Sequence, residues 1–411
     1  MRAGLLGRKL GHSFSPRIHS FLGNYSYELF EIEPENLGAF LQGDGFDALN
    51  VTIPYKKDVI PYLAELSPAA RAIGSVNTIV RRADGSLFGD NTDAAGFSGM
   101  VRRLCINPAG KKALILGSGG ASLTAQYVLR EMGASEVIVI SRSGEDNYEN
   151  MDRHADAHIL VNATPVGMYP HNGISPVDLS RLPALEAVLD LIYNPARTQL
   201  LLDAQARGIP CINGLFMLAE QARKASERFT GASLDPALSE KVFGILRAET
   251  ENIVLIGMPG CGKTTIGQIL SEKTGKPVLD ADAVLTEKVG MSIPEYFATH
   301  TEDEFRQVET EVLREICRMS GQIIATGGGC VTRSENRDLL RQNSRVFYIE
   351  RSLELLPTDG RPLSQRGSLQ EMYAKRHPLY INFADVRIAN TDAPEASAEK
   401  IMEAFYENSG N

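Results

Sequence analysis

The sequence predicts an α/β protein built on parallel sheets and divided into two nucleotide-binding parts. Short apolar runs alternate with amphipathic stretches along almost all of its 411 residues, a pattern typical of sheets whose strands are joined by helices. Two glycine-rich turns each follow an apolar run, at residues 112–117 and 252–257. Because such turns begin nucleotide-binding sheets, and because a domain has roughly 150 residues, we expect two to three domains.

The composition excludes several classes of protein. With 43% hydrophobic and 23% charged residues the whole chain should fold. A net charge of -9 argues against nucleic acid or an anionic membrane as the main partner. No apolar run approaches the ~20 residues of a membrane span, and no signal-like stretch opens the chain, so we expect a cytoplasmic protein. The five cysteines form no CxxC pair and predict reduced thiols. A homo-oligomer remains open.

The second glycine turn has the pattern of a phosphate-binding loop. It reads GMPGCGKT over residues 257–264 and fits G-x-x-x-x-G-K-[ST], with an apolar strand before it and an amphipathic helix after it. Backbone N–H groups at such a turn cradle phosphate oxygens, while Lys263 reaches the outer phosphates and Thr264 can ligate Mg²⁺. The predicted ATP-binding residues are Gly257, Gly260, Cys261, Gly262, Lys263, Thr264 and Thr265.

Polar residues follow the next apolar runs. Asp280 and Asp282 end one run, and in an extended segment two residues at i and i+2 point the same way. One carboxylate could serve Mg²⁺ and the other an acceptor hydroxyl; the alternative is an exposed pair that caps a helix. Residues 322–329 read as a strand running into three glycines, where backbone can approach a ligand, although alone this is only a turn.

A helix is predicted to begin at the capping box of residues 301–304, because apolar residues then recur at helical spacing. Arg306 and Glu309 flank its apolar face, three residues apart. On this pattern alone they form a surface ion pair.

From about residue 252 to the C-terminus the chain resembles shikimate kinase. Its motifs correspond to the phosphate loop, D-x-D at 280–282, F-R-x-x-E at 305–309, G-G-G at 327–329, R-P-L at 361–363 and R-x-P-L-Y at 376–380. The resemblance implies a P-loop kinase domain with a parallel sheet that uses Mg-ATP. The lid between Glu350 and Arg361 is shorter than is usual in the family.

The resemblance also implies a role for each matching residue. Arg306 and Arg376 hold the shikimate carboxylate, and Gly328 and Gly329 lie against the ring. Asp282 orients the 3-hydroxyl and accepts its proton. The remaining implied roles are Mg²⁺ binding by Thr264 and Asp280, and stabilisation of the transferring phosphoryl group by Lys263 and Arg361.

The first glycine turn reads GSGGAS over residues 117–122, which fits a dinucleotide turn except that Ser122 replaces a glycine or alanine. The following strand, residues 136–140, ends at Ser141-Arg142-Ser143. An arginine at this place favours the 2′-phosphate of NADP. Glu145 and Asp146 weaken that preference, because either could reach a ribose if the loop turned back.

The first 100 residues carry further polar clusters. Ser13 and Ser15 could donate together to a carboxylate, or could belong to a simple turn. Lys56 follows an apolar strand and is either solvated or paired with Asp93, which ends a polar loop. A lysine and aspartate facing a nicotinamide could pass a proton during hydride transfer.

From Met1 to about Arg247 the chain resembles shikimate dehydrogenase. The matching motifs are H-S-x-S-P at 12–16, N-V-T-x-P-x-K at 50–56, G-x-V-N-T at 74–78, N-T-D at 91–93, G-x-G-G-A at 117–121, N-A-T-P-x-G-M at 162–168 and M-L-x-x-Q-A at 217–222. The resemblance implies that Lys56 and Asp93 transfer the proton. The implied substrate ligands are Ser13, Ser15, Thr52, Asn77, Asp93, Tyr193 and Gln221. The implied NADP ligands are Gly117, Ser118, Gly119, Gly120, Ala121, Ser141, Arg142, Thr164, Gly214 and Met217.

Together these features predict a bifunctional enzyme of aromatic biosynthesis that reduces 3-dehydroshikimate with NADPH and then phosphorylates shikimate. The expected domains are a substrate domain at 1–98 with 212–247, a Rossmann NADP-binding domain at 99–211 and the kinase at 252–411. Two alternatives stay open. One half could be a silent regulatory module, or the first half could oxidise quinate with NAD.

Overall fold

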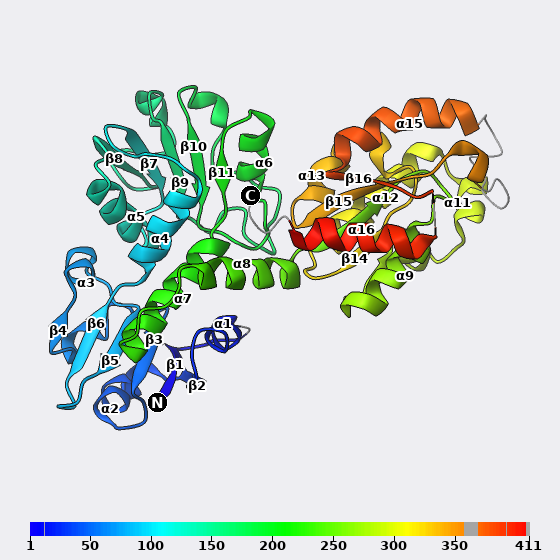
Figure 1. Ribbon diagram of the computed structural model, residues 1–411. Coiled ribbons are helices and arrows are strands. Elements are labelled where there is room, and N and C mark those ends of the chain that lie inside the picture. The colour runs from blue at the N-terminus through cyan, green and yellow to red at the C-terminus, as the bar shows by residue number, and fades with distance from the viewer. Residues whose placement is uncertain (12, 357–368, 392, 408–411) are drawn as a thin grey trace. The chain divides into compact units, whose positions relative to one another are not determined.

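The computed structural model describes residues 1–411 except 12, 357–368, 392 and 408–411. Its contacts divide the chain into two compact units, each of α/β construction (Figure 1). The first unit contains Met1–Val166, Ser175–Tyr193 and Asp203–Phe243. The second unit contains Gly167–Ile174, Asn194–Leu202 and Gly244–Asn411.

The N-terminal sheet is mixed and has six strands. Across the sheet they run β2 (Ser26–Glu31), β1 (Arg2–Gly7), β3 (Ala48–Val51), β5 (Thr78–Arg81), β6 (Leu87–Asp90) and β4 (Glu65–Leu66). β1 is parallel to both of its neighbours, whereas β5 is antiparallel to both of its own. The helices of this part are α1 (Ser15–His19), α2 (Leu37–Gln42), α3 (Pro68–Ile73) and α4 (Asp93–Arg103).

The second sheet of the first unit is parallel throughout. Its strands run β11 (Cys211–Ile212), β10 (Ala187–Asp190), β9 (Ile159–Asn162), β7 (Lys112–Leu116) and β8 (Glu136–Ile140). Helix α5 (Gly120–Glu131) follows β7, and α6 (Gln199–Ala206) follows β10. β9 and β10 are buried along their whole length, as expected for central strands covered on both faces.

Helix α7 (Leu215–Thr230) lies far from α4 in the sequence but packs against it within the first unit. Two glycines of α4 permit the close approach: a Cβ on Gly96 would lie 2.7 Å from the Met217 carbonyl oxygen, and one on Gly99 would lie 3.0 Å from Cγ of Glu220. Any larger residue at these positions would push the two helices apart. The pair therefore holds Met217 beside the helix that begins at Asp93.

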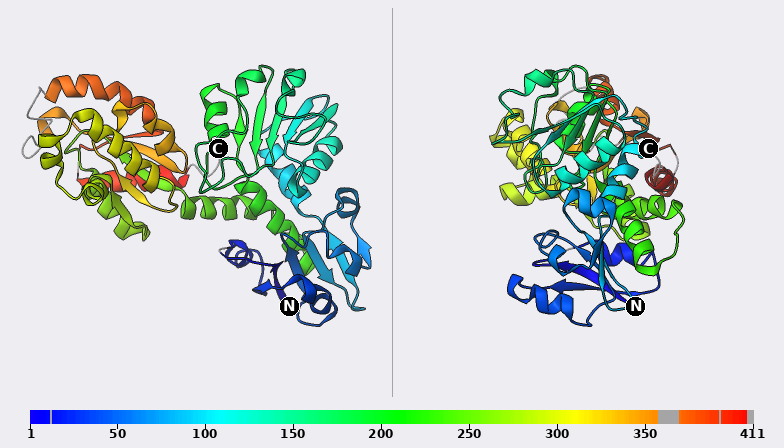
Figure 2. Two further views of the ribbon diagram at one scale, coloured as in Figure 1. Left: turned by 180° about the vertical axis from the view of Figure 1, so that it is seen from behind. Right: turned by 90° about the vertical axis from the view of Figure 1, so that its left-hand side faces the viewer.

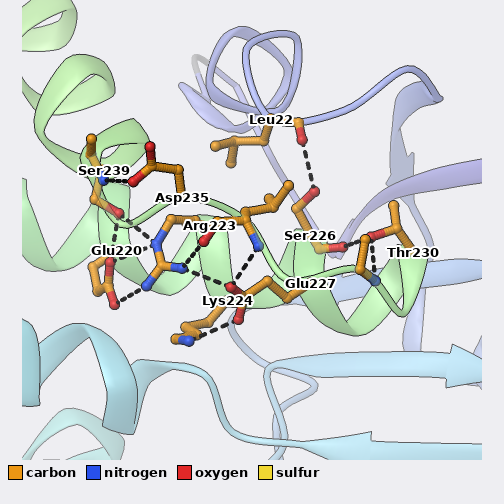
Figure 3. Close-up of polar contacts among 12 residues, drawn as sticks. Leu22, Glu220, Arg223, Lys224, Ser226, Glu227, Thr230, Asp235 and Ser239 are labelled. Atoms are coloured by element: carbon orange, nitrogen blue, oxygen red, sulfur yellow. Dashed lines mark hydrogen bonds and ion pairs between the residues drawn. The ribbon is translucent and has the colours of Figure 1, made fainter.

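A buried arginine joins α7 to α8 (Ala237–Thr250) (Figure 3). Arg223 is 3% exposed and donates from Nη2 to Glu220 at 2.7 Å and from Nη1 to Glu227 at 2.7 Å. Its Nε donates to Ser239 at 3.0 Å. Because every one of these groups has a partner, the network can stay buried without an unpaired charge.

The second unit contains a five-stranded parallel sheet with helices on both faces (Figure 2). Its strands run β13 (Val278–Asp280), β14 (Ile323–Ala325), β12 (Asn252–Ile256), β15 (Ser344–Glu350) and β16 (Val386–Ala389). The helices are α9 (Lys263–Thr274), α10 (Ala281–Val289), α11 (Ile293–Thr299), α12 (Glu302–Ile316), α13 (Asn336–Arg341), α15 (Leu369–Phe383) and α16 (Pro394–Glu407). The carboxyl ends of the parallel strands meet at one edge, where polar side chains gather.

Short 3-10 helices complete the described secondary structure. They occupy Pro34–Asn36, Ile60–Tyr62, Met151–His154, Leu179–Arg181, Cys330–Thr332 and Leu353–Leu355. The five cysteines, all of which lie among the described residues, form no disulfide; Cys261, Cys317 and Cys330 are buried and Cys105 is exposed. In the part of the chain that the structure describes, no helix is long and apolar enough to cross a membrane.

Candidate active sites

The first unit brings Lys56 and Asp93 together, as the family resemblance implied, and does not leave Lys56 solvated alone. Lys56 follows β3, and its Nζ lies 2.6 Å from Oδ2 of Asp93. Asp93 is the first residue of α4, where the helix macrodipole stabilises a carboxylate. Both side chains are only partly exposed, at 30% and 18%. The pair is thus a charge-assisted hydrogen bond that can hold a proton donor in a fixed position.

Asn77 lies beside this pair with its amide already engaged. Its Oδ1 accepts from the Thr92 N–H at 2.7 Å and from the Thr78 hydroxyl at 3.0 Å. Its Nδ2 donates to the Thr92 hydroxyl at 3.1 Å. One N–H of Asn77 remains for a ligand, so any substrate contact must be a donated hydrogen bond.

The predicted carboxylate-binding residues lie at the start of α1. Ser15 is its first residue, and the Ser15 N–H donates to Oγ of Ser13 at 3.2 Å. The Phe14 ring meets Tyr193 edge to face with centroids 6.3 Å apart. This contact places Tyr193, from a distant part of the sequence, next to the two serines.

The other predicted binding residues of the first unit lie on different elements of the fold. Thr52 directly follows β3 and is partly buried. Gln221 lies on α7, and its Nε2 donates to the Leu218 carbonyl at 3.0 Å rather than to Lys56 or Asp93. Gly214 immediately precedes α7, where a Cβ would overlap the Leu191 carbonyl oxygen. Only glycine fits there.

The first glycine turn has the shape of a dinucleotide-binding turn. Gly117 has φ +98, and a Cβ on it would lie 2.9 Å from Thr164 of the neighbouring turn, so a larger residue is excluded. Residues 118–121 are exposed or partly exposed, and a Cβ on Gly119 or Gly120 would meet nothing within 4 Å. The open space and the N–H groups at the start of α5 fit a pyrophosphate. Ser122 is buried, and its hydroxyl accepts from Gln126 at 3.2 Å.

The turn after β8 carries Arg142 together with the two acidic residues that could oppose NADP. Arg142 and Glu145 are exposed. Asp146 is held by His154, whose Nε2 lies 2.8 Å from the carboxylate, so Asp146 is less available to a ribose than Glu145 is.

The phosphate loop of the second unit links β12 to α9. Gly260 and Gly262 have φ +82 and +103, which side chains other than glycine rarely adopt. Lys263 is buried, and its Nζ donates to the carbonyls of Gly257 at 2.9 Å and Met258 at 3.1 Å. The lysine therefore lies folded over the loop, where it can reach a bound phosphate.

Thr264 and Asp280 form the candidate metal position. The Thr264 hydroxyl donates to Oδ2 of Asp280 at 2.9 Å, so both oxygens face one point. Among the described residues no group of three or more His, Cys, Asp or Glu side chains could hold a metal. Phosphate oxygens and water would have to complete the shell of Mg²⁺, which usually keeps several waters.

The two aspartates do not share an extended segment, so that part of the prediction was wrong. β13 ends at Asp280, whose Oδ1 accepts from the N–H of Asp282 at 3.0 Å and caps α10. Asp282 already lies in the first turn of that helix. The helix begins one residue after the strand ends because Asp280 satisfies its free N–H groups. The alternative of an exposed pair is also wrong for Asp282, which lines a cavity.

Burial raises the pKa of Asp282, and the charge of Asp280 raises it further, while Lys263 and Arg306 oppose the rise. A carboxyl with a raised pKa is a better proton acceptor than an exposed aspartate. Gly327 makes room for it, because a Cβ there would lie 2.6 Å from Asp282 and 2.7 Å from Glu309.

We expect Asp282→Asn to raise the melting temperature while abolishing activity of this site. The folded protein binds the proton of Asp282 more tightly than the unfolded chain does. The free energy of unfolding therefore falls as pH rises through the raised pKa and Asp282 ionises. Removing that charge should therefore raise the melting temperature at neutral pH by a few degrees, the usual size of a single-substitution effect in a domain of this length. Asp280→Ala is the control: it removes a cap and should lower the melting temperature. A lower melting temperature for Asp282→Asn would contradict this account.

Arg306 and Glu309 form an ion pair, but it is buried rather than on the surface as their spacing alone indicated. Nη1 of Arg306 donates to Glu309 at 2.8 Å, and the two side chains are 7% and 3% exposed. Burial raises the pKa of Glu309, and Arg306 counters that rise. The glycine run causes the burial, because its backbone covers the guanidinium: a Cβ on Gly329 would overlap Arg306.

A second arginine comes from α15. Arg376 is buried, and its Nη1 donates to the Gly328 carbonyl at 3.1 Å, beside the Tyr380 hydroxyl at 2.5 Å from the same oxygen. A cavity of about 650 Å³ lies between these groups. Its polar walls include Lys263, Thr264, Asp280, Asp282, Arg306, Gly328, Gly329 and Arg376. The cavity thus presents phosphate-binding groups and two arginines around the partly buried carboxylate of Asp282.

Several residues that line this cavity were not identified from the sequence. Arg351 directly follows β15, and its place at the carboxyl end of a strand could have revealed it. Ile293, Pro294 and Phe297 form an apolar wall that only the tertiary packing reveals. The predicted lid residue Arg361 lies outside the described residues.

The two sites define two classes of enzyme. The first unit has the dinucleotide turn and paired lysine and aspartate of an oxidoreductase, and the second has the phosphate loop and acceptor cavity of a phosphotransferase. Family models named shikimate dehydrogenase substrate binding domain and shikimate kinase match residues 5–79 and 259–406. The chain belongs to the shikimate dehydrogenase family and carries a shikimate kinase domain at its C-terminus.

Similar proteins support the family of the first unit. Shikimate dehydrogenase (NADP(+)) of Clostridium perfringens strain 13 is 34% identical over 265 residues, which cover 59% of this chain and 97% of the relative. The Synechocystis protein of the same name is 36% identical over 254 residues, 54% of this chain and 87% of the relative.

Solved structures show the same relationship. Shikimate 5-dehydrogenase of Thermus thermophilus in complex with NADP(H) and shikimate matches with 33% identity and a TM-score of 0.54, over 59% of this chain and 98% of that one. Quinate dehydrogenase of Corynebacterium glutamicum in complex with NAD matches with 30% identity and a TM-score of 0.54, over 59% and 97%.

Proposed function

We propose that this protein catalyses two consecutive reactions of the shikimate pathway. The first unit reduces 3-dehydroshikimate to shikimate with NADPH, and the second transfers phosphate from Mg-ATP to the 3-hydroxyl of shikimate. The pairing of Lys56 with Asp93 at 2.6 Å carries the first assignment. Asp282, which is partly buried and lines one cavity with Arg306 and Lys263, carries the second.

In the dehydrogenase reaction the bound nicotinamide supplies the hydride, and the chain supplies binding and the proton. Lys56 donates a proton to the substrate oxygen, and Asp93 holds the lysine in place. Ser13, Ser15 and Tyr193 bind the substrate carboxylate. The ring hydroxyls contact Thr52, Asn77, Asp93 and Gln221. The dinucleotide lies along Gly117, Ser118, Gly119, Gly120, Ala121, Ser141, Arg142, Thr164, Gly214 and Met217.

In the kinase reaction Mg-ATP supplies the phosphoryl group. Arg306 and Arg376 bind the shikimate carboxylate, and Gly328 and Gly329 let the ring approach the backbone. Asp282 accepts the proton of the 3-hydroxyl. Thr264 and Asp280 hold Mg²⁺, while Lys263 and Arg361 stabilise negative charge on the transferred group.

The proposal includes the division of the chain into a substrate domain at 1–98 with 212–247, a Rossmann domain at 99–211 and a kinase domain at 252–411. The packing of α7 on α1 and β5, which both lie within residues 1–98, supports the discontinuous substrate domain. We further propose a cytoplasmic location and no nucleic-acid or membrane partner, on the grounds of charge and composition.

Arg142→Ala should weaken NADP binding and leave NAD binding unchanged. An exposed arginine that contacts a phosphate is worth about 1–2 kcal/mol, so the KM for NADP should rise about tenfold. Arg153→Ala, which also removes a basic residue that follows β8, is the control. Steady-state oxidation of shikimate with each cofactor gives both values. An unchanged KM for NADP would show that Arg142 does not select the cofactor.

The test of the proposed function is two separate assays on the full chain. Shikimate should drive NADP reduction and, with Mg-ATP, ADP formation. Quinate with NAD tests a second candidate, which the similarity to a quinate dehydrogenase favours. A higher kcat/KM for quinate and NAD than for shikimate and NADP would overturn the assignment of the first unit as a shikimate dehydrogenase. ADP formation that does not depend on shikimate would overturn the assignment of the second unit as a shikimate kinase.

A further inference from the structure

Arg306 is oriented by its surroundings from several sides. Its Nη1 donates to buried Glu309 at 2.8 Å, and its guanidinium carbon lies 5.2 Å from the centre of the Phe305 ring. The backbone of Gly329 covers another side, since a Cβ there would overlap the guanidinium. These three contacts are enough to fix a rotamer that is 7% exposed.

Glu302 makes a fourth contact of a different kind. It lies one helical turn before Arg306 on α12, and its Oε1 accepts from Nη2 at 3.1 Å. Its side chain is 54% exposed, whereas that of Glu309 is 3% exposed. Since the guanidinium is already fixed, the contact with Glu302 is not needed to orient it.

Arg306 is also the group that the proposed function assigns to the shikimate carboxylate. A carboxylate binds a guanidinium best through two parallel N–H donors. Glu309 and Glu302 each accept one N–H, from Nη1 and Nη2 respectively, while the buried Nε has no hydrogen-bond partner within the described part of the chain. An incoming carboxylate that pairs with Nη2 therefore meets a negative charge already there. Asp282 adds a third negative charge to the surroundings of Arg306.

We propose that Glu302 is an internal competitor of the substrate carboxylate: it occupies Nη2 of Arg306 and yields it when shikimate binds. The inference rests on the proposed kinase function. Glu302 weakens shikimate binding through competition and charge repulsion, without taking part in phosphoryl transfer. The exposed glutamate can swing into water, because no other described residue is hydrogen-bonded to its side chain.

The proposal predicts that replacing Glu302 strengthens shikimate binding. Replacement of a residue with a purely structural role would leave the affinity for shikimate unchanged or lower it, whereas removal of a competitor raises that affinity. We expect Glu302→Gln to lower the KM for shikimate about two- to fivefold, the range set by exposed ion pairs. The kcat should stay within about twofold and the KM for ATP should not change, because Glu302 is not among the described residues that line the cavity with Lys263 and Asp282.

Asp303→Asn is the matched control. Asp303 is the next residue of the same first turn, is 75% exposed and pairs with Arg333 at 2.7 Å instead of Arg306. Asp303→Asn removes one negative charge from the same helix end. Because Asp303 does not pair with Arg306, this substitution should leave the KM for shikimate unchanged.

The experiment measures the KM for shikimate in ADP formation at saturating Mg-ATP and without NADP, for the full chain and both variants, because only this reaction reports the second unit's shikimate site alone. A lower KM for Glu302→Gln alone supports the proposal. An unchanged or higher KM for Glu302→Gln, or an equal fall in Asp303→Asn, overturns it. If the unmodified chain forms no ADP in response to shikimate, the proposed function has failed instead. Added salt should reduce the difference in the KM for shikimate between Glu302→Gln and the unmodified chain, because Glu302 is exposed and its charge is screened.

Discussion

Lys56→Ala should lower the rate of shikimate oxidation about a thousandfold and leave the kinase rate unchanged. The substitution removes the proposed proton donor and leaves Asp93 without the ammonium group that lies 2.6 Å away. Positioned acid–base groups typically contribute factors of about 10²–10⁴. Most of the loss should be in kcat, because the proposed substrate ligands Ser13, Ser15 and Asn77 are left unchanged.

The neighbouring lysine supplies the control for this variant. Lys57 is exposed and adjoins Lys56 in the sequence, so Lys57→Ala removes the same charge one residue away. Steady-state NADP reduction for both variants checks the prediction. Equal rates for Lys56→Ala and the unmodified chain would show that another group supplies the proton.

Lys263→Ala should lower shikimate-dependent ADP formation about a hundred- to a thousandfold, the range for removing one donor to a developing negative charge. Lys263 is buried in the phosphate loop and held by the carbonyls of Gly257 and Met258. No other described lysine lines the cavity. Dehydrogenase activity should not change, because the two sites use different sheets.

Lys273→Ala controls for the loss of a lysine from the same helix. Lys273 lies near the end of α9 and pairs with exposed Glu399 at 3.1 Å. Its substitution should leave both activities unchanged. Retention of ADP formation in Lys263→Ala would mean that the activity does not arise at the phosphate loop, and would favour the alternative of a silent second half.

Local sequence patterns predicted the elements that carry the two nucleotide turns. Each apolar run before a glycine turn became a central strand, and the capping box at Thr301 begins α12. These features depend on residues close in sequence, so their physical causes can be recognised without the fold.

Features that depend on distant contacts could not be predicted in this way. Asp282 was assigned to an extended segment because two residues do not distinguish the end of a strand from the start of a helix. The Arg306–Glu309 pair is buried only because the glycine run from another part of the chain covers it. The position of Tyr193 beside Phe14 likewise joins segments about 180 residues apart in the sequence, and only the family resemblance indicated it.

The central claim is that one chain carries two working sites for consecutive reactions. Its most direct test is mass analysis of the products after the purified full chain is incubated with 3-dehydroshikimate, NADPH and Mg-ATP. The account predicts shikimate 3-phosphate, with NADPH and ATP both consumed. Accumulation of shikimate while ATP remains unchanged would contradict the kinase assignment, and recovery of unreacted 3-dehydroshikimate would contradict the dehydrogenase assignment.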